Sequence, residues 1–344
     1  MSTRIAVLGT GANGASIGAD LTRAGLDVTF IEQWPDHVEA MRRNGLRINI
    51  AGSTEVTDVR VRHLCEVAEM QHGFDVVLLM VKAYDTRWAC ELIKPMLADD
   101  GVVVGIQNGM TMNDIGDIVG GARTLGSVIE VASTMFEPGI VQRDTSREMS
   151  WFAVGGTDPA AHARAPEVAE ILSHAGRVEV SDDIISSKWM KLVANCTELV
   201  TSAVLDMTVM QAVQVPGMKN VMVEAGNEAV RTCLQLGHRL RPIIGMTEDD
   251  VTAPENFAAA LLRVVHDDFS IEGQLTTVLQ DWRKGRRSEV HELNGHIVRA
   301  QQTLGGNAPV NAAVVKVAVQ VENGSLTPGP DNATQLRSAL PALR

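Results

Sequence analysis

The sequence lacks several features that would assign it to common protein classes. None of its four cysteines, at positions 65, 90, 196 and 233, forms a CxxC pair, so we expect neither a zinc motif nor a redox motif. We expect no metal site. Free thiols fit a reducing compartment better than a disulfide scaffold. No apolar run is long enough to cross a membrane, and MSTRIAVLGTG at the start has no signal-peptide core. We therefore expect no membrane span and a cytoplasmic location.

Positive charge is also scarce. The 344 residues include 30 Lys and Arg against 42 Asp and Glu, which gives a formal net charge of −12, and no long Lys/Arg run occurs. A chain this acidic is a poor candidate for binding nucleic acid or an anionic membrane. The hydrophobic content of 45% is that of an ordinary globular protein, and the length suffices for two domains.

The first half of the chain alternates between apolar runs and amphipathic segments. Residues 4–8, 27–32, 74–82 and 101–109 predict strands, and the last two are continuously apolar, which is typical of strands buried on both faces. Helical segments lie between them, so this half predicts an α/β fold, a doubly wound parallel sheet with helices on both faces. Residues from about 127 to 156 predict hairpin or edge strands that close this domain.

The second half is almost entirely helical in pattern. The polar SDD at 181–183 is a plausible helix cap, so we expect a first domain at 1–182 and an all-α domain at 183–325. The Pro- and Gly-punctuated residues 326–344 predict a loosely held tail. The expected helices cover 184–213, 216–237, about 255–265, 268–285, 288–304 and 309–322.

A glycine turn follows the first predicted strand. In GTGANG, Gly9, Gly11 and Gly14 have the G-x-G-x-x-G spacing between a strand and a helix, the context of a dinucleotide-binding turn. Gly9 allows the tight turn, Gly11 lets the backbone approach a pyrophosphate, and Gly14 lets helix and strand pack closely. Ala12 and Asn13 belong to the same predicted cofactor-binding turn. The alternative is a plain strand–helix turn.

An acid ends the next predicted strand. Glu32 follows the glycines by roughly 20 residues, where a carboxylate can accept hydrogen bonds from a ribose diol and repel a 2′-phosphate. We therefore expect NAD or NADP as the cofactor, with NAD favoured. The alternative for Glu32 is an exposed residue at a strand end.

Two lysines lie in the apolar helix KWMKLVANCTELV. Lys188, Lys191, Asn195 and Glu198 form one polar stripe on a helix that is apolar nearly all round. A buried lysine has a lowered pKa and can donate a proton and a positive charge to a developing alkoxide. The alternative is that both lysines reach solvent along their flexible stems.

The glycine turn, VKAYDT, IQNGM, KWMKLVANC and GRRSEVHELNG, in this order and at these intervals, resemble the ketopantoate reductase family over roughly residues 4–322. The resemblance implies a Rossmann-type domain, a helical C-terminal domain, a small-molecule substrate, and a homodimer in many members. It implies hydride transfer between NAD(P) and a 2-oxo or 2-hydroxy acid.

The resemblance also assigns residues to roles. Lys191 matches the catalytic lysine, and Glu289 matches a carboxylate that contacts substrate and helps to position it. Asn195 matches a substrate-binding asparagine, while Lys82 and Asn108 match residues near cofactor and substrate. Lys188 has no counterpart, and we take it for a structural or surface lysine.

Three positions depart from the family pattern. Leu199 stands where the family has a second asparagine, so Glu198 beside it is expected to take over hydroxyl binding or to serve a different substrate. Thr277 replaces a serine that binds the substrate carboxylate and keeps the hydroxyl. Glu32 departs because the best-known members use NADPH.

Two other functions stay open. One is a dinucleotide-binding sensor without turnover, since a fold does not fix a function. The other keeps hydride transfer but acts on a different hydroxy or oxo substrate with NAD, or forms opines by reductive amination.

Overall fold

The chain consists of two compact units, Met1–Ile185 and Ser186–Arg344, and each is described by itself. The computed structural model describes residues 2–70, 73–243, 245–265 and 273–340. The division falls within the first turn of helix α7 (Ile184–Ala203), close to the boundary that the sequence suggests at 182/183.

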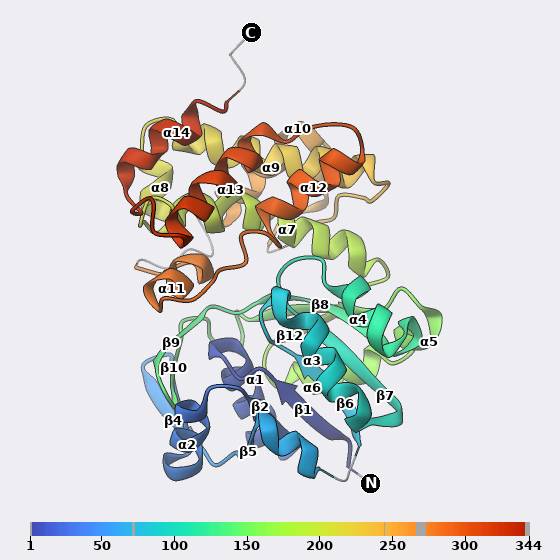
Figure 1. Cartoon of the computed structure of the whole chain (residues 1–344). Helices are drawn as coiled ribbons and strands as arrows, with labels where there is room; N and C mark the ends of the chain where they lie inside the picture. Colours follow the sequence, from blue (N-terminus) through green and yellow to red (C-terminus); the bar gives the residue numbers. More distant parts are fainter. Residues whose placement is uncertain (1, 71–72, 244, 266–272, 341–344) are drawn as a thin grey trace. The chain divides into compact units, whose positions relative to one another are not determined.

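The first unit is built on an eight-stranded sheet among the residues described. Its strands follow the order β5-β2-β1-β6-β7-β8-β11-β12. Figure 1 labels most of them, including β1, β6 and β7. From β5 to β8 every neighbouring pair is parallel, whereas β11 runs antiparallel to β8. The bounds are β1 (Arg4–Leu8), β2 (Asp27–Glu32), β5 (Arg60–His63), β6 (Phe74–Leu79), β7 (Leu97–Ile106), β8 (Thr124–Glu130), β11 (Trp151–Gly155) and β12 (Arg177–Val180).

Helices cover both faces of this sheet, as the apolar strands predict. Ile5 and Val7 of β1 belong to a core shared with the helices α1 and α6, while Ala6 and Leu8 belong to a second core shared with α3 and α4. Successive side chains of a strand point to opposite faces, so the two cores lie on the two sides of the sheet. The doubly wound α/β prediction is confirmed. The helices are α1 (Ala12–Arg23), α2 (Pro35–Asn44), α3 (Thr86–Ile93), α4 (Met112–Val119), α5 (Pro159–His162) and α6 (Ala165–Ser173).

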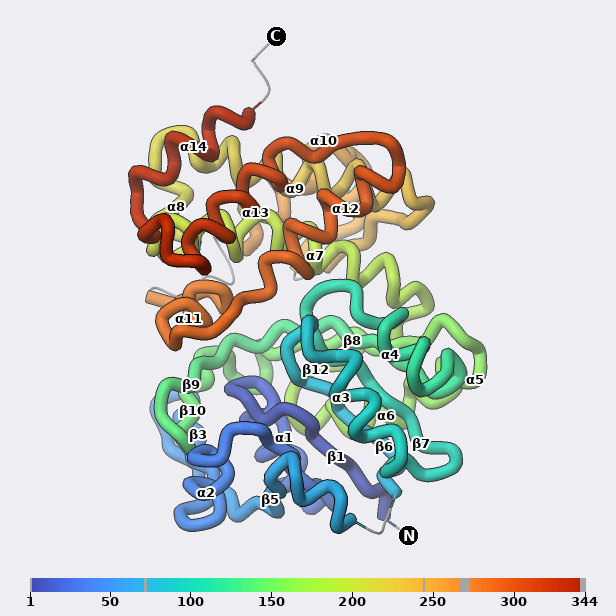
Figure 2. Tube along the Cα trace, viewed as in Figure 1, coloured from blue at the N-terminus to red at the C-terminus, as the bar shows by residue number. Residues whose placement is uncertain are grey.

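A second, four-stranded sheet was not predicted. Its order is β4-β3-β10-β9, from β3 (Leu46–Ile50), β4 (Ser53–Thr57), β9 (Ser133–Glu137) and β10 (Ile140–Arg143). Figure 2 shows the blue segment that carries β3 beside the green segment that carries β9 and β10, although the two are far apart in the sequence. Residues 127–156 contain a predicted hairpin, because β9 and β10 pair antiparallel, but β10 also pairs with β3 in the second sheet. The flanking strands β8 and β11 join the main sheet.

The second unit is helical. Its helices are α7, α8 (Val209–Gln214), α9 (Met218–Gln235), α10 (Pro254–Val264), α11 (Thr277–Arg283), α12 (Asn294–Thr303), α13 (Pro309–Glu322) and α14 (Ala333–Arg337). The predicted helix 184–213 is broken after Ala203, where Asp206 adopts a positive φ of 55°. The predicted helix 288–304 begins only at Asn294. The predicted start of the helix at 268 lies outside the described residues.

The prediction of a loosely held tail at 326–344 is wrong for residues 326–340. The Asn332 side-chain amide donates a hydrogen bond to the Val204 carbonyl at 2.9 Å, and Leu336 is fully buried. These contacts are long-range, so the Pro and Gly content of the segment does not reveal them. Residues 341–344 lie outside the described part.

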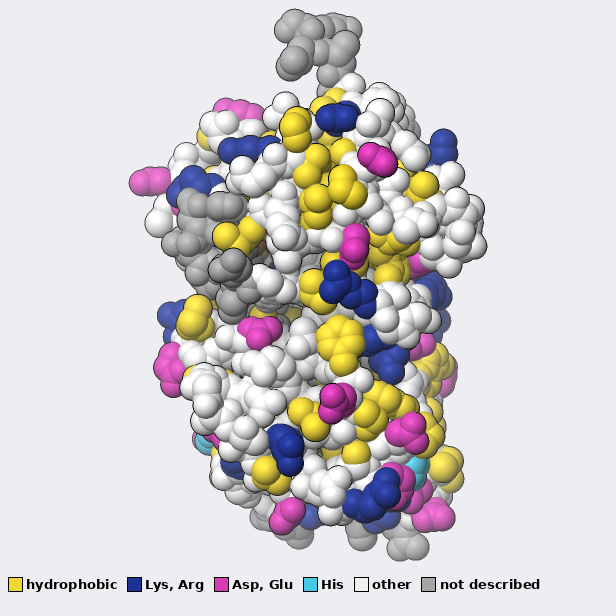
Figure 3. Space-filling view, turned by 90° about the vertical axis from the view of Figure 1, so that its left-hand side faces the viewer, with side chains coloured by type: hydrophobic (Ala, Val, Ile, Leu, Met, Phe, Trp, Pro, Cys, Tyr) yellow, Lys and Arg dark blue, Asp and Glu magenta, His cyan; other side chains and the backbone are white. Residues whose placement is uncertain are grey.

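The surface of the described chain is mixed in charge. On the face drawn in Figure 3, basic and acidic side chains are interspersed with hydrophobic ones. Among the residues described, no helix combines the length and hydropathy needed to cross a membrane.

Candidate active site

The glycine turn lies at the point where the strand order of the main sheet reverses. The chain leaves β1 toward β2 on one side and returns to β6 on the other side of β1. The carboxyl ends of β1 and β6 therefore flank a crevice in which doubly wound folds bind ligands. Gly9 follows β1, and Lys82 lies shortly after β6.

The three glycines of the turn differ in what a side chain at each position would contact. Gly9 has a φ of +92°, and a Cβ there would lie 2.7 Å from the Val81 nitrogen. A Cβ on Gly14 would lie 2.2 Å from the Gly9 oxygen, so both sites require glycine for close packing. A Cβ on Gly11 would have no heavy atom within 4 Å. The space at Gly11 and the first backbone N–H groups of α1, at Ala12 and Asn13, suit a pyrophosphate.

Glu32 is buried and bonded within the turn. Its Oε2 accepts hydrogen bonds from the Thr10 N–H at 2.7 Å and the Thr10 hydroxyl at 2.8 Å. Its Oε1 accepts from the N–H groups of Gln33 and Trp34, each at 2.9 Å. A carboxylate has about four acceptor positions, and these four bonds use them, so a ribose hydroxyl would have to share an oxygen with a backbone N–H or with the Thr10 hydroxyl. The alternative of an exposed residue at a strand end is wrong.

Lys82 and Asn108 follow neighbouring parallel strands, β6 and β7. A residue that the sequence reasoning passed over joins these two strand ends. The Gln107 side-chain amide donates to the Val81 carbonyl at 2.8 Å and to the Thr86 hydroxyl at 3.0 Å. Gln107 is buried and therefore fixes the loop that carries Lys82 against the loop that carries Asn108. The IQNGM motif contains it, but its partners are not visible in the sequence.

The predicted stripe on α7 is largely buried. Asn195 and Glu198 are buried, whereas Lys191 is half-buried. Leu199, at the position of the family's second asparagine, is also half-buried. Lys191, Asn195 and Leu199 are spaced by four residues, so they share one face of the helix. On this face Lys191 and Leu199 are half-buried, and Asn195 between them is buried.

Lys188 is not a surface lysine, because its side chain is only 3% exposed. Of the two expected roles, surface or structural, only the structural one remains. Burial lowers the pKa of Lys188 to about 8, and the negative charge of Glu289 opposes this lowering. Helical spacing places Lys188 and Lys191 nearly side by side, and only tertiary packing decides which of them is buried.

Glu289 does not begin a helix, because α12 starts at Asn294. It lies in the turn before this helix and is buried. The Asn294 amide ties this turn to α7 by donating to the Cys196 carbonyl at 3.1 Å, and it also donates to Asn311 at 2.8 Å. Glu228 in turn accepts from the N–H groups of Val310 and Asn311 at the start of α13. Residues outside the predicted site therefore fix the position of Glu289.

Thr277 is the first residue of α11, and its hydroxyl is buried without a hydrogen-bond partner in the described part of the chain. The preceding Thr276 hydroxyl donates to the Leu199 carbonyl of α7 at 3.2 Å. A buried hydroxyl without a partner costs free energy unless a ligand or water satisfies it. This geometry suits the predicted role of Thr277 in holding a substrate group.

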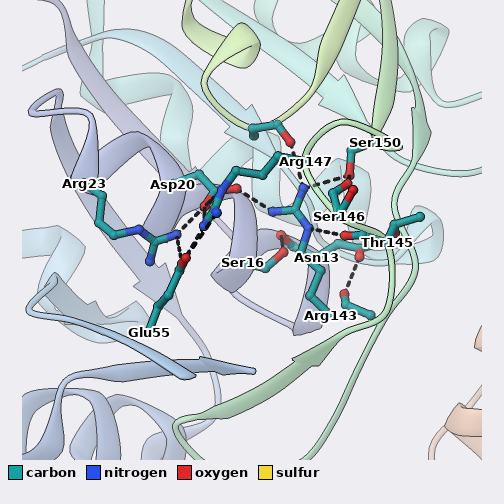
Figure 4. A network of polar contacts seen from close by, with 12 residues as sticks. Asn13, Ser16, Asp20, Arg23, Glu55, Arg143, Thr145, Ser146, Arg147 and Ser150 are labelled. Atoms are coloured by element: carbon teal, nitrogen blue, oxygen red, sulfur yellow. Dashed lines mark hydrogen bonds and ion pairs between the residues drawn. The ribbon is translucent and has the colours of Figure 1, made fainter. Parts of the chain in front are cut away.

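A network of ion pairs anchors helix α1, which follows the glycine turn (Figure 4). Asp20 of α1 pairs with Arg143, and both side chains are buried. Asp20 also pairs with Arg23 and with Arg147. Glu55 of β4 binds Arg23 at 2.8 Å and Arg147 at 2.5 Å. The network joins α1 to the second sheet and to the segment between β10 and β11.

One cavity of the described residues lies apart from this site. A cavity of about 400 Å³ is lined by Arg4, Asp27, Arg60 and Phe74, the first residues of four main-sheet strands, so it opens at the edge opposite the glycine turn. No group of three or more His, Cys, Asp or Glu side chains in the described ranges is placed to hold a metal ion.

Comparisons with known proteins find similar proteins that match both units of the chain. The curated 2-dehydropantoate 2-reductase of Archaeoglobus fulgidus is 26% identical over 327 residues, which are 93% of this chain and 98% of that protein. The crystal structure of a PanE/ApbA family ketopantoate reductase from Ralstonia eutropha JMP134 superposes with a TM-score of 0.79 at 27% identity and covers 94% of this chain and 99% of that one.

The ternary structure of D-mandelate dehydrogenase with NADH and anilino(oxo)acetate shares the fold, with a TM-score of 0.83 at 21% identity. It covers 94% of this chain and 99% of that chain. The sequence model of the family described as "Ketopantoate reductase PanE/ApbA" matches residues 5–155, and its C-terminal counterpart matches residues 183–322. The chain therefore belongs to the ketopantoate reductase family of oxidoreductases, in which it is a divergent member.

Proposed function

We propose that the protein interconverts a 2-oxo acid and the corresponding 2-hydroxy acid with a nicotinamide dinucleotide. The observation that carries the proposal is the face of α7 on which half-buried Lys191 is followed one turn later by buried Asn195. Family membership supplies the reaction class, and Lys191 supplies the proton that hydride transfer to a carbonyl requires.

The cofactor is proposed to bind at the glycine turn of the first unit. The N–H groups of Ala12 and Asn13, the space beside Gly11 and the positive end of α1 suit a pyrophosphate. The buried carboxylate of Glu32 disfavours a 2′-phosphate by charge, so we propose NAD rather than NADP. The NADH named for the structurally similar D-mandelate dehydrogenase is consistent with this choice.

In the proposed mechanism the glycine turn would hold a reduced nicotinamide dinucleotide, which would supply the hydride for the carbonyl carbon of the substrate. As the carbon–oxygen π electrons move onto the oxygen, the ammonium group of Lys191 donates a proton to it and stabilises the developing charge. Glu289 would contact the substrate and orient Lys191, while Asn195 and Asn108 would bind the substrate. In the reverse direction, neutral Lys191 accepts the proton of the hydroxyl group.

The substrate is proposed to be a 2-oxo acid whose carboxylate is held by the Thr277 hydroxyl. The name 2-dehydropantoate 2-reductase, which the curated relatives carry, makes ketopantoate the first candidate. Leu199 cannot donate a hydrogen bond to a substrate hydroxyl, and Glu198 beside it is proposed to take that role or to serve another substrate. A second candidate function is therefore oxidation of a different 2-hydroxy acid with NAD.

The first experiment follows nucleotide absorbance with purified protein, ketopantoate, and NADH or NADPH in parallel. Turnover of ketopantoate would identify a ketopantoate reductase, and a faster reaction with NADH would support the role of Glu32. Without turnover, NADH binding in a fluorescence titration would keep the cofactor proposal and direct attention to a panel of 2-hydroxy acids with NAD. Absence of binding and of turnover would overturn the proposal. A cytoplasmic homodimer is part of the proposal, and light scattering tests the dimer.

A further inference from the structure

His37 lies at the centre of a buried chain of hydrogen bonds that ends on the glycine turn. It belongs to the first turn of α2 and is fully buried. Its Nε2 lies 2.9 Å from the Thr10 carbonyl oxygen, and its Nδ1 accepts a hydrogen bond from the Gly139 N–H at 2.8 Å. Because the Gly139 N–H can only donate, the imidazole proton is on Nε2 and is donated to Thr10.

Thr10 lies between Gly9 and Gly11, and His37 and Glu32 together bond all of its polar groups. The Thr10 N–H and hydroxyl donate to Glu32, while the Thr10 carbonyl accepts from His37. Thr10 is fully buried, so water does not compete for these bonds. Glycines on both sides leave this backbone with more freedom than other residues allow, and the bonds to Thr10 remove that freedom.

The other end of the chain of bonds lies in the second sheet. Gly139 forms the turn between β9 and β10, and its φ is +77°. A Cβ on Gly139 would lie 3.0 Å from the Cβ of Ala40 in α2, so glycine permits the close approach that the bond to His37 needs. The Gly139 carbonyl also accepts a hydrogen bond from the Arg47 N–H of β3 at 2.9 Å.

We propose that His37 is a positioning residue that presets the glycine turn for the pyrophosphate of the dinucleotide. It does so by fixing Thr10 from α2 and from the second sheet, so the turn needs little reorganisation when cofactor binds. Preorganisation of this kind strengthens binding without adding a contact to the ligand. The inference rests on the proposed function, because it requires that the turn binds NAD or NADP.

The test compares the full-length variants His37→Phe and His37→Gln with the wild type. His37→Phe keeps an aromatic ring but leaves the Thr10 carbonyl and the Gly139 N–H without a partner. We expect the dissociation constant of NADH, measured by fluorescence titration, to rise about 10-fold. The kcat at saturating NADH should stay within about 2-fold, because the reacting groups are unchanged. His37→Gln, whose amide can both donate and accept, should restore part of the affinity.

His162→Phe is the matched control. This histidine of the same unit also accepts a backbone N–H, that of Gly156 at 3.4 Å, but its bond does not involve the glycine turn. We expect its NADH affinity to equal that of the wild type. Wild-type affinity in a folded His37→Phe variant would overturn the inference, even if its melting temperature fell.

A remote variant covers the case in which His37→Phe does not fold. Gly139→Ala changes the β9–β10 turn and should weaken NADH binding several-fold, whereas unchanged affinity in the folded variant would contradict the inference. If the wild type itself binds neither NADH nor NADPH, the proposed function has failed. A wild type that binds while the variants bind equally well refutes only the role of His37.

Discussion

The ammonium group of Lys188 and the carboxylate of Glu289 are buried in the same helical unit, and the charge of Glu289 acts against the lowering of the Lys188 pKa by burial. Lys188 lies three residues before Lys191 on α7. Lys188 and Glu289 are therefore buried groups of opposite charge that act on each other within the unit that also carries Lys191.

The first prediction concerns stability at alkaline pH. Lys188 has a folded pKa of about 8 against an ordinary value of 10.5, so the unfolded chain binds more protons between these values and stability rises with pH in that window. Between about pH 7 and pH 10, we expect the wild type to gain on the order of 2 kcal/mol relative to Lys188→Met in urea unfolding. The exposed Lys219→Met is the control. A difference that does not change with pH would contradict the burial of Lys188.

The second prediction concerns the proton donor. Lys191→Ala should lower kcat by about 10²–10⁴-fold and leave the dissociation constant of NADH unchanged, because Lys191 is not among the residues proposed to hold the dinucleotide. Stopped-flow absorbance and fluorescence titration measure the two quantities. Lys219→Ala should match the wild type in both. Activity close to wild type in Lys191→Ala would remove this lysine from the mechanism.

The third prediction concerns Gln107. Gln107→Leu removes its bonds to the Val81 carbonyl and the Thr86 hydroxyl, so the strand ends that carry Lys82 and Asn108 lose their connection. We expect kcat/KM to fall about 10-fold or more. A double-mutant cycle with Thr86→Val should show a coupling of about 0.5–3 kcal/mol. Additive effects would mean that the two side chains act separately.

The fourth prediction concerns specificity. If Leu199 excludes the hydroxyl of ketopantoate, Leu199→Asn should raise kcat/KM for ketopantoate while lowering it for the substrate found in the panel of acids. Glu198→Ala should lower kcat/KM for that substrate by about 10-fold, the effect of one lost hydrogen bond to a charged group. Steady-state kinetics with both substrates test this. Unchanged kinetics in Glu198→Ala would show that Glu198 has no role in binding.

The fifth prediction concerns the ion-pair network of α1. Asp20→Asn leaves the buried guanidinium of Arg143 without its carboxylate, and we expect a loss of about 3–5 kcal/mol in unfolding free energy. Asp117→Asn removes an exposed partner of Arg87 and should cost at most about 1 kcal/mol. Chemical denaturation of both variants measures the contrast. Equal effects would mean that Asp20 and Arg143 are not buried together.

The fold was predictable where the pattern is local. The apolar runs of β1, β2, β6 and β7 and the glycine spacing each lie within about ten residues, so the parallel sheet and its turn follow from the sequence. The second sheet was not predictable, because β3 and β4 carry mixed side chains and β3 pairs with β10, far along the chain.

The candidate site residues that lie within sequence motifs were predictable. The residues that fix their positions through hydrogen bonds, such as His37, were not. His37 lies 27 residues from Thr10 and 102 residues from Gly139 in the sequence. No periodicity links such positions. The burial of Lys188 likewise depends on neighbours from other helices, whereas helical spacing alone treats it like Lys191.

The pairing of Asp20 with Arg143 also bears on how the first unit forms during synthesis. Asp20 leaves the ribosome 123 residues before its buried counter-charge. Until Arg143 arrives, Asp20 has only Arg23 of its own helix as a partner in this network, and burying the carboxylate is more costly in free energy. The end of α1 that carries Asp20 therefore completes its packing late, and a fragment that ends before β10 would contain the glycine motif without the buried partner of Asp20.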